Sequence, residues 1–319
     1  MRKFIKNIIR ETFCIFIFYS GILSIYSFFI RNRVTILNYH DINGENFERH
    51  ARYLIKNFNI ISLSECISWL KGEKKTNNNL VITFDDGYKS FYREIFPMLK
   101  KYNIPATVFL ATDYIGSNKL FWFDLLKICF EEKGIKAFGD NIGNIKENFD
   151  SIISYLNLLE DDEKKKRIYK IKQENHIDYY TEKAKSYQIL SWTEVKEMAA
   201  SLVCFGAHTM THPILTKISR DKARKEIYGS KEELEKQIDS EVRFFAYPNG
   251  DSTHFNDEII NVIIEAGFSC ALTTINGDCK VGDNLFKLKR KVVSGDFNIP
   301  CLAAKISGLW ITLSRKRSG

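Results

Sequence analysis

The feature that most constrains this fold is a regular alternation of short apolar segments with segments of helical pattern, beginning at residue 34. Helical patterns at 47–57, 64–71 and 88–102 separate several of the apolar segments, and Ser64 is the expected cap of the second. Strands that alternate with helices form parallel sheets. About eight such units in 319 residues predict an α/β fold whose sheet closes, or nearly closes, into a (β/α) barrel. The expected strands are 34–39, 60–63, 80–84, 106–111, 203–207, 243–247, 269–273 and 287–292.

One segment, residues 115–190, interrupts this alternation. It contains no clear strand pattern and is charged and helical in character. We expect it to form a helical insertion in the domain. The aromatic run Phe121-Trp122-Phe123 near its start is expected to anchor the insertion, because aromatic clusters are more often part of a core.

The first 33 residues differ in composition from the rest of the chain. Residues 12–30 carry no charge and are just long enough to cross a bilayer as a helix. More basic residues precede this stretch than follow it, which predicts a single-pass segment with the domain outside the cytoplasm. Polar residues dilute the stretch, so a helix lying flat on the cytoplasmic face of the membrane is the alternative. In both cases residues 1–33 are expected to contact membrane lipid.

Positive charge gathers at both ends of the chain. The 47 Lys and Arg against 39 Asp and Glu give a net charge of +8, and residues 299–319 form an expected amphipathic basic tail after a domain at 34–298. No basic run interleaved with aromatics occurs elsewhere, so nucleic acid is not an expected partner. The seven cysteines are scattered without a C-x-x-C pair, which argues against a disulfide framework.

Two adjacent carboxylates end one of the expected strands. The apolar run 80–84 leads directly into Asp85, Asp86 and Gly87. Neighbouring side chains of a strand point to opposite faces, so the two acids can perform different tasks at one strand end. A bound cation would offset the cost of placing both acids there. Asp-Gly alone is also common in plain turns, which is the alternative interpretation.

Two histidines follow another expected strand. His208 and His212 come just after 203–207, and Pro213 disfavours helical geometry at His212, so the pair is expected in a turn. Two imidazoles with one carboxylate form a three-ligand set that leaves open positions, as a catalytic metal requires. A third stretch, Tyr247-Pro248-Asn249-Gly250, can aim backbone N–H groups at the same edge, although alone it reads as an ordinary turn.

These stretches together resemble the polysaccharide deacetylase family, the NodB-homology domain of carbohydrate esterases. The motifs are 83–87, 208–213 and 247–250, in that order. The opening Asn38-Tyr39-His40-Asp41 also resembles the membrane-associated branch found with surface-polysaccharide genes. The resemblance covers roughly residues 34–293, with the insertion less typical.

The resemblance implies a distorted (β/α) barrel of the polysaccharide deacetylase type that holds a divalent metal, usually zinc. By this resemblance Asp85 is the general base, and the backbone N–H of Asn249 joins the metal in stabilising the oxyanion. The implied substrate is an acetylated polysaccharide or oligosaccharide at the cell surface or outside the cell, and the reaction is hydrolysis of a non-peptide carbon–nitrogen bond. The implied metal ligands are Asp86, His208 and His212. Candidate substrate contacts are Tyr247, Pro248 and Trp122.

Two departures from the family pattern leave alternatives open. The family often carries a late Leu-x-His motif whose histidine protonates the leaving amine, but no histidine follows His254. The family also often has an arginine where this chain has Ala246. Arg290 is the candidate substitute for holding Asp85, and His40 is the candidate acid. The alternatives are a carbohydrate-binding pseudoenzyme, an O-acetyl esterase of the same fold, and a different metal hydrolase acting on small amides or lipid-linked sugars.

Overall fold

The computed structural model describes the chain except for residues 1, 24–31, 75–76, 143–147, 177–181 and 310–319. Its centre is one eight-stranded sheet with the order β7-β6-β5-β4-β3-β1-β8, and β2 pairs with β3. The strands are β1 (Val34–Tyr39), β2 (Asn59–Ile60), β3 (Asn79–Phe84), β4 (Ala106–Leu110), β5 (Val203–Ala207), β6 (Phe244–Ala246), β7 (Cys270–Leu272) and β8 (Lys291–Val292).

Every pairing between these strands is parallel, as the alternation predicts. Leu288, just before β8, forms a parallel bridge with Leu272 of β7, while β8 itself pairs with β1. One chain segment therefore reaches both edges of the curved sheet. The expected distorted (β/α) barrel is confirmed, with its closure resting on this short segment.

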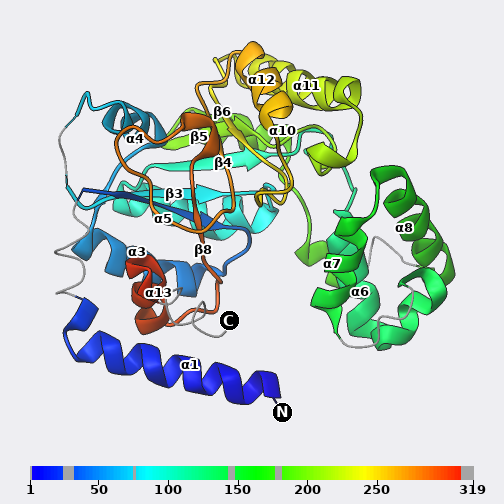
Figure 1. Ribbon diagram of the computed structural model, residues 1–319, viewed down its shortest axis with the longest axis horizontal. Coiled ribbons are helices and arrows are strands. Elements are labelled where there is room, and N and C mark those ends of the chain that lie inside the picture. Colours follow the sequence, from blue (N-terminus) through cyan, green and yellow to red (C-terminus); the bar gives the residue numbers. More distant parts are fainter. Residues whose placement is uncertain (1, 24–31, 75–76, 143–147, 177–181, 310–319) are drawn as a thin grey trace.

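Helices surround the sheet (Figure 1). The α-helices of the barrel and its ends are α1 (Arg2–Tyr19), α3 (Gly44–Asn57), α4 (Leu63–Leu70), α5 (Phe96–Tyr102), α10 (Trp192–Ala199), α11 (Arg220–Ile238), α12 (Asp257–Glu265) and α13 (Ile299–Ser307). Those of the insertion are α6 (Trp122–Lys133), α7 (Phe149–Leu158), α8 (Asp161–Asn175) and α9 (Glu182–Ser186).

The core has one cluster on each face of the sheet. Ile36 and Val81 pack in a cluster with residues of α4, whereas their strand neighbours Leu37 and Ile82 pack in the larger cluster with the surrounding helices. The alternation follows from the two-residue period of a strand. Because both faces are covered, the strands are mostly apolar, and polar residues within them, such as Asn38 and Thr83, are hydrogen-bonded.

Several expected boundaries are wrong in detail. Helix α4 is capped by Ser62 rather than Ser64, because Ser62 and Glu65 form a reciprocal capping box. Strand β2 is accordingly shorter than 60–63. The expected strand 287–292 is reduced to β8, preceded by a 3-10 turn at Leu285–Lys287. The expected helix 88–102 consists of a π-helical turn at Phe91–Ile95 followed by α5.

The insertion forms a lobe of its own, shown in green beyond the arrowheads of β3 and β4 in Figure 1. A backbone hydrogen bond from Gly116 N–H to the Leu190 carbonyl, at 2.8 Å, closes its base. Residues of α6, α7 and α8, among them Leu126, Ile152 and Ile171, form a separate apolar cluster. The lobe therefore has its own core beside the carboxyl ends of the strands.

The two ends of the described chain pack together. Cys14 and Ile17 of α1 are buried against Cys301 and Ala304 of α13. Helix α13 also contacts α3, so the start of the expected basic tail is packed against the fold. Among the described helices, none is both long enough and apolar enough to span a membrane. Part of the uncharged stretch 12–30, residues 24–30, lies outside the described residues.

Candidate active site

The sequence motifs meet at one edge of the sheet, because parallel strands bring their carboxyl ends together. Asp85 and Asp86 follow β3, and His208 and His212 follow β5. Asn249 follows β6, and His40 follows β1. Arg290, by contrast, lies immediately before β8.

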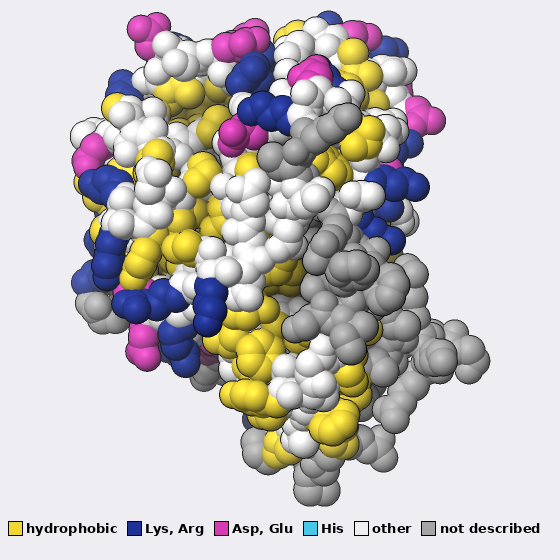
Figure 2. Space-filling model, turned by 90° about the vertical axis from the view of Figure 1, so that its left-hand side faces the viewer, with side chains coloured by type: hydrophobic (Ala, Val, Ile, Leu, Met, Phe, Trp, Pro, Cys, Tyr) yellow, Lys and Arg dark blue, Asp and Glu magenta, His cyan; other side chains and the backbone are white. Residues whose placement is uncertain are grey.

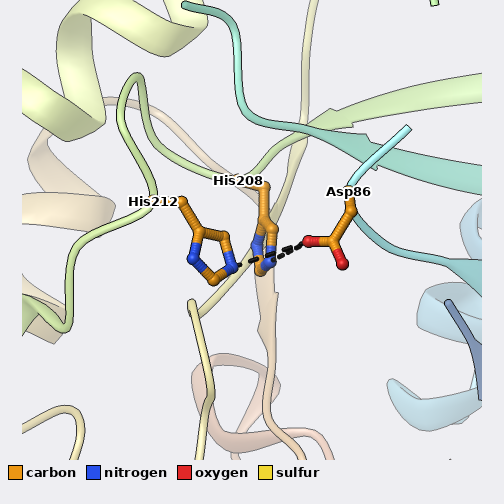
Figure 3. Close-up of side chains that lie close together, drawn as sticks. All are labelled: Asp86, His208 and His212. Carbon is orange, nitrogen blue, oxygen red and sulfur yellow. Dashed lines mark ion pairs between the residues drawn. The ribbon is translucent and has the colours of Figure 1, made fainter. Parts of the chain in front are cut away.

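Asp86, His208 and His212 form a compact group of buried side chains from two loops (Figure 3). Oδ1 of Asp86 lies 3.8 Å from Nε2 of His208 and 3.6 Å from Nε2 of His212. One ligand atom from each residue lies within 4.8 Å of the others. Among the described residues, no hydrogen-bond donor reaches the buried Oδ1 of Asp86. A carboxylate and two imidazoles converging around an unpartnered oxygen fit a divalent metal.

The surroundings favour the protonation states that a metal requires. Nδ1 of His208 lies 2.7 Å from the Ala246 carbonyl, so it is the protonated nitrogen and leaves the Nε2 lone pair facing Asp86. Burial lowers the pKa of His208 to about 4 and holds the pKa of His212 well below its usual value. Both rings are therefore neutral at physiological pH. Burial, together with the charge of Asp85, raises the pKa of Asp86, a cost that a bound cation would remove.

Unusual backbone geometry positions these ligands. Asp86, Thr209 and His212 all have left-handed backbone conformations, with φ of 72°, 67° and 58°. The loop between the histidines is held by Glu226, whose carboxylate accepts the backbone N–H groups of Met210 and Thr211, each at 2.8 Å. His212 therefore lies in a turn, as Pro213 predicts. The hydrogen bonds from this loop to Glu226 hold its strained, left-handed backbone in place.

Asp85 lies beside this group in a different environment. Nη1 and Nη2 of Arg290 donate to its two oxygens at 2.8 Å each, and Nδ2 of Asn38 donates at 2.9 Å. Burial alone would raise the pKa of Asp85, but the charge and hydrogen bonds of Arg290 outweigh burial and hold that pKa well below its usual range. The structure therefore brings Arg290 to the position that the sequence analysis proposed for it.

His40 lies at the edge of the same site. Its side chain is 43% exposed, and Nε2 lies 4.0 Å from Oδ2 of Asp85. Desolvation and the charge of Arg290 lower the pKa of His40, and Asp85 opposes them. His40 is the only histidine besides the two candidate ligands that lines the described cavity, so it remains the candidate acid.

The turn after β6 divides its residues between core and site. Asn249 lines the cavity, with its backbone in a left-handed conformation at φ 58°. Tyr247 is fully buried; its hydroxyl donates to the Phe286 carbonyl at 2.9 Å, and its ring stacks on Phe255. Pro248 is buried too, and neither residue lines the cavity. The expectation that Tyr247 and Pro248 contact substrate is therefore not supported by their positions, because their side chains support the turn from inside the core.

A cavity of about 670 Å³ opens over these residues. Residues of the insertion form one wall, and Trp122 is among them, as expected for a substrate contact. Of the aromatic run, Phe121 is fully buried as an anchor, whereas Phe123 lines the cavity and meets the ring of His212 edge-on at 5.7 Å. The insertion residues of the wall are Trp122, Phe123, Asp124, Lys127, Phe149, Asp150, Ile153, Ser154 and Tyr187.

Asp124 is a wall residue that the sequence analysis missed. It is only 4% exposed, and its Oδ2 accepts the Tyr88 hydroxyl at 2.7 Å. Burial raises the pKa of Asp124 to about 7, against the opposing effects of Tyr88 and Lys127. Nothing local marks this residue, since an acid in the first turn of a helix is ordinary.

Comparison with known proteins places this site in a family. The family model for polysaccharide deacetylases matches residues 72–271, more than half of the chain. The chain belongs to the polysaccharide deacetylase family. Polysaccharide deacetylases are hydrolases that use a divalent metal, which agrees with the group formed by Asp86, His208 and His212.

Relatives and solved structures agree with this membership. The Bacillus subtilis protein YxkH, whose name assigns it to the polysaccharide deacetylases, is 22% identical over 87% of this chain and 77% of its own length. The poly-β-1,6-N-acetyl-D-glucosamine N-deacetylase of Staphylococcus epidermidis is 35% identical, over 28% of this chain and 32% of its own length. The structure of IcaB from Ammonifex degensii superposes with a TM-score of 0.58 at 19% identity, covering 86% of this chain and 97% of that one. This last likeness concerns the fold of the deacetylase domain.

Proposed function

We propose that this polysaccharide deacetylase removes acetyl groups from N-acetylated sugars of a cell-surface or extracellular polysaccharide. The single observation that carries the proposal is the pairing of a three-ligand group with an ionised carboxylate, Asp85, held by Arg290. The N-deacetylase activity in the names of the staphylococcal relatives supports an amide substrate. We take the metal to be zinc, which suits a set of two imidazoles and one carboxylate with open positions.

The chain's own residues divide the work of amide hydrolysis. A metal bound by Asp86, His208 and His212 would supply Lewis acidity, lowering the pKa of water to about 7 and polarising the acetyl carbonyl. Asp85, ionised beside Arg290, accepts a proton from the attacking water. The backbone N–H of Asn249 donates to the developing oxyanion. In its protonated form, His40, exposed to the cavity, donates a proton to the leaving amine.

The retained Asp85–Arg290 pair favours an enzyme over a carbohydrate-binding pseudoenzyme. A binding module gains nothing from a buried carboxylate kept ionised by a buried guanidinium, since burying both charges is costly. An esterase is the sharper alternative, because an alcohol leaves without help more readily than an amine. Loss of the His40 side chain should therefore slow amide hydrolysis more than ester hydrolysis, which distinguishes the two activities.

The test is acetate release from matched N-acetylated and O-acetylated oligosaccharides. Wild type is expected to release acetate from the N-acetylated substrate, and His40→Ala is expected to lower that rate by ~10²–10⁴ while affecting the ester less. His254→Ala is the control, because His254 lies outside the cavity lining. Equal losses on both substrates would make His40 structural, and wild type active on the ester alone would identify an O-acetyl esterase.

We also propose that the protein attaches to a membrane through α1. The face of α1 opposite Cys14 and Ile17 exposes apolar side chains, including Ile9 at 63% and Phe16 at 65%. Figure 2 shows hydrophobic side chains gathered at the lower end of the molecule, where Figure 1 places α1. The same helix begins with Arg2, Lys3 and Lys6 in sequence, a combination that suits an anionic bilayer surface. A surface polysaccharide as substrate favours the outer side of that membrane.

A further inference from the structure

The insertion forms one wall of the cavity, but the proposed hydrolytic chemistry does not require that wall. The candidate ligands, base, acid and oxyanion donor all come from loops of the barrel. Helices α6 and α7, which pack around a separate apolar cluster, nevertheless provide eight of the cavity residues, and Tyr187 adds a ninth. Rigid helices with their own core are suited to holding a ligand in a fixed orientation.

The wall begins directly at the metal ligands. Phe123 meets the ring of His212 at 5.7 Å, and Trp122 precedes it at the start of α6. Both aromatic side chains are partly exposed and line the cavity. Apolar ring faces of this kind cover the C–H faces of sugars. A ligand whose acetyl group lay at Asp86 and His212 would therefore extend along α6.

Polar groups follow the aromatic side chains on the same helix. Asp124 and Lys127 are three residues apart on α6, so they share one face of the helix, and both line the cavity. Tyr88 occupies one oxygen of Asp124, at 2.7 Å, and a carboxylate has further acceptor capacity at the other. Lys127 supplies N–H donors and no acceptor. An acceptor and a donor at this spacing match two neighbouring hydroxyls, one of which donates while the other accepts.

The charge pattern points to a neutral sugar rather than a cationic one. Asp124, whose pKa burial raises to about 7, would attract a deacetylated, cationic amino sugar only in its ionised form, and Lys127 would repel it, so the pair gives such a sugar little net attraction. Neighbouring hydroxyls use both groups without conflict. We propose that α6 forms a subsite for a neutral sugar residue of the acetylated chain, with Asp124 and Lys127 binding its hydroxyls and Trp122 covering its apolar face.

The subsite rests on the proposed function, because it assigns the length and composition of the same substrate. It implies that the enzyme acts on an oligosaccharide or polymer in which the sugar next to the reacting one keeps its hydroxyls free. Removing Asp124 should then weaken substrate binding while leaving the chemical step nearly intact.

The experiment measures binding and catalysis in the full-length protein. An N-acetylglucosamine tetramer is titrated calorimetrically, and kcat and KM are measured for the tetramer. Asp124→Ala is expected to raise Kd and KM about 10–100-fold, the usual loss of a hydrogen bond to a charged group, with kcat changed little. Asp124→Asn, which keeps an acceptor for Tyr88, should lose less. Asp140→Asn, exposed on the same insertion and outside the cavity lining, should behave as wild type.

The outcomes separate the subsite from the reaction. A folded Asp124→Ala protein that binds the tetramer like wild type overturns the subsite, as does a loss confined to kcat. If Asp124→Ala does not fold, Lys127→Ala and Trp122→Leu take its place, and unchanged Kd in both overturns the subsite. A wild type that binds the tetramer through Asp124 but releases no acetate refutes the proposed function and leaves the subsite standing.

Discussion

At the scale of single residues, two adjacent aspartates have opposite environments. Asp85 receives three hydrogen bonds from Arg290 and Asn38, whereas Oδ1 of Asp86 faces two neutral imidazoles without a donor. We expect Asp85→Asn to retain metal and lose turnover, because an amide cannot accept the proton of water. Asp86→Asn should lose both together. Metal analysis alongside acetate release checks this, and identical behaviour of the two variants would contradict the division of roles.

A second residue-scale prediction concerns pH. The pKa of Asp124, raised by burial to about 7, means that the folded metal-free protein keeps a proton there which the unfolded chain releases. Stability contributed by this neutral carboxyl is present at low pH and falls by about 1.4 kcal/mol per pH unit as pH rises towards 7. Asp124→Asn cannot ionise, so its melting temperature relative to wild type should rise between pH 5 and 7.

Control melts use Asp140→Asn, an exposed aspartate on the same insertion. Its melting temperature should follow wild type at every pH. A difference between Asp124→Asn and wild type that does not change with pH would show that Asp124 is ionised throughout.

Residues of the site differ in how far the sequence predicts them. Asp86, His208 and His212 are found because each lies in a local motif at a strand end. Arg290 is found by a different argument, as a substitute for the arginine that the family often has at the position of Ala246. Asp124 is missed, because its partner Tyr88 lies 36 positions away and no local pattern links them. The left-handed backbone of Asp86 is likewise imposed by tertiary contacts.

At the scale of elements, the turn after β3 depends on Gly87. Its φ of 78° is left-handed, and a Cβ there would lie 2.5 Å from Cδ2 of the fully buried Leu110. We expect Gly87→Ala to destabilise the fold by about 1–3 kcal/mol and to weaken metal binding by displacing Asp86. Gly282→Ala is the matched control, because its φ of 86° is likewise left-handed but a Cβ there would meet no atom within 4 Å. Denaturant unfolding and metal titration of both variants measure the difference.

The order of elements is predictable, and their ends are less so. Apolar runs such as that of β3 are predicted well because burial on both faces leaves few polar positions within the strand. Ser62 and Ser64 are both plausible caps by residue type, and only the reciprocal bond with Glu65 selects Ser62. β8 is limited to Lys291–Val292, because only Leu37 and Asn38 of β1 pair with it, and no local pattern encodes that tertiary contact.

At the scale of the whole molecule, α1 has one apolar face that packs on the fold and another that is exposed. Ile17 packs on α13, whereas Ile9 and Phe16 face outward. We expect the double variant Ile9→Ser, Phe16→Ser to remain folded and to bind anionic liposomes at least about tenfold more weakly, because each buried side chain contributes roughly 1.5–3 kcal/mol. Flotation of full-length proteins with liposomes measures this.

Removal of residues 1–33 is a second test of the role of α1. Because β1 begins at Val34, the truncated domain should fold and no longer float with liposomes. Unfolding or aggregation of the truncated protein would show that the fold needs α1 packed on α13 to remain stable. Flotation of the double variant equal to wild type would refute the membrane surface.

The pairing of Arg290 with Asp85 also affects how the protein is made. The two residues are 205 positions apart in the chain. At about 5–20 residues per second, a ribosome needs roughly 10–40 s to travel from one to the other. Throughout that time Asp85 has no guanidinium beside it, and a carboxylate left unpaired in a protein interior is costly. The ion pair at the end of β3 can therefore form only after residue 290 has left the ribosome.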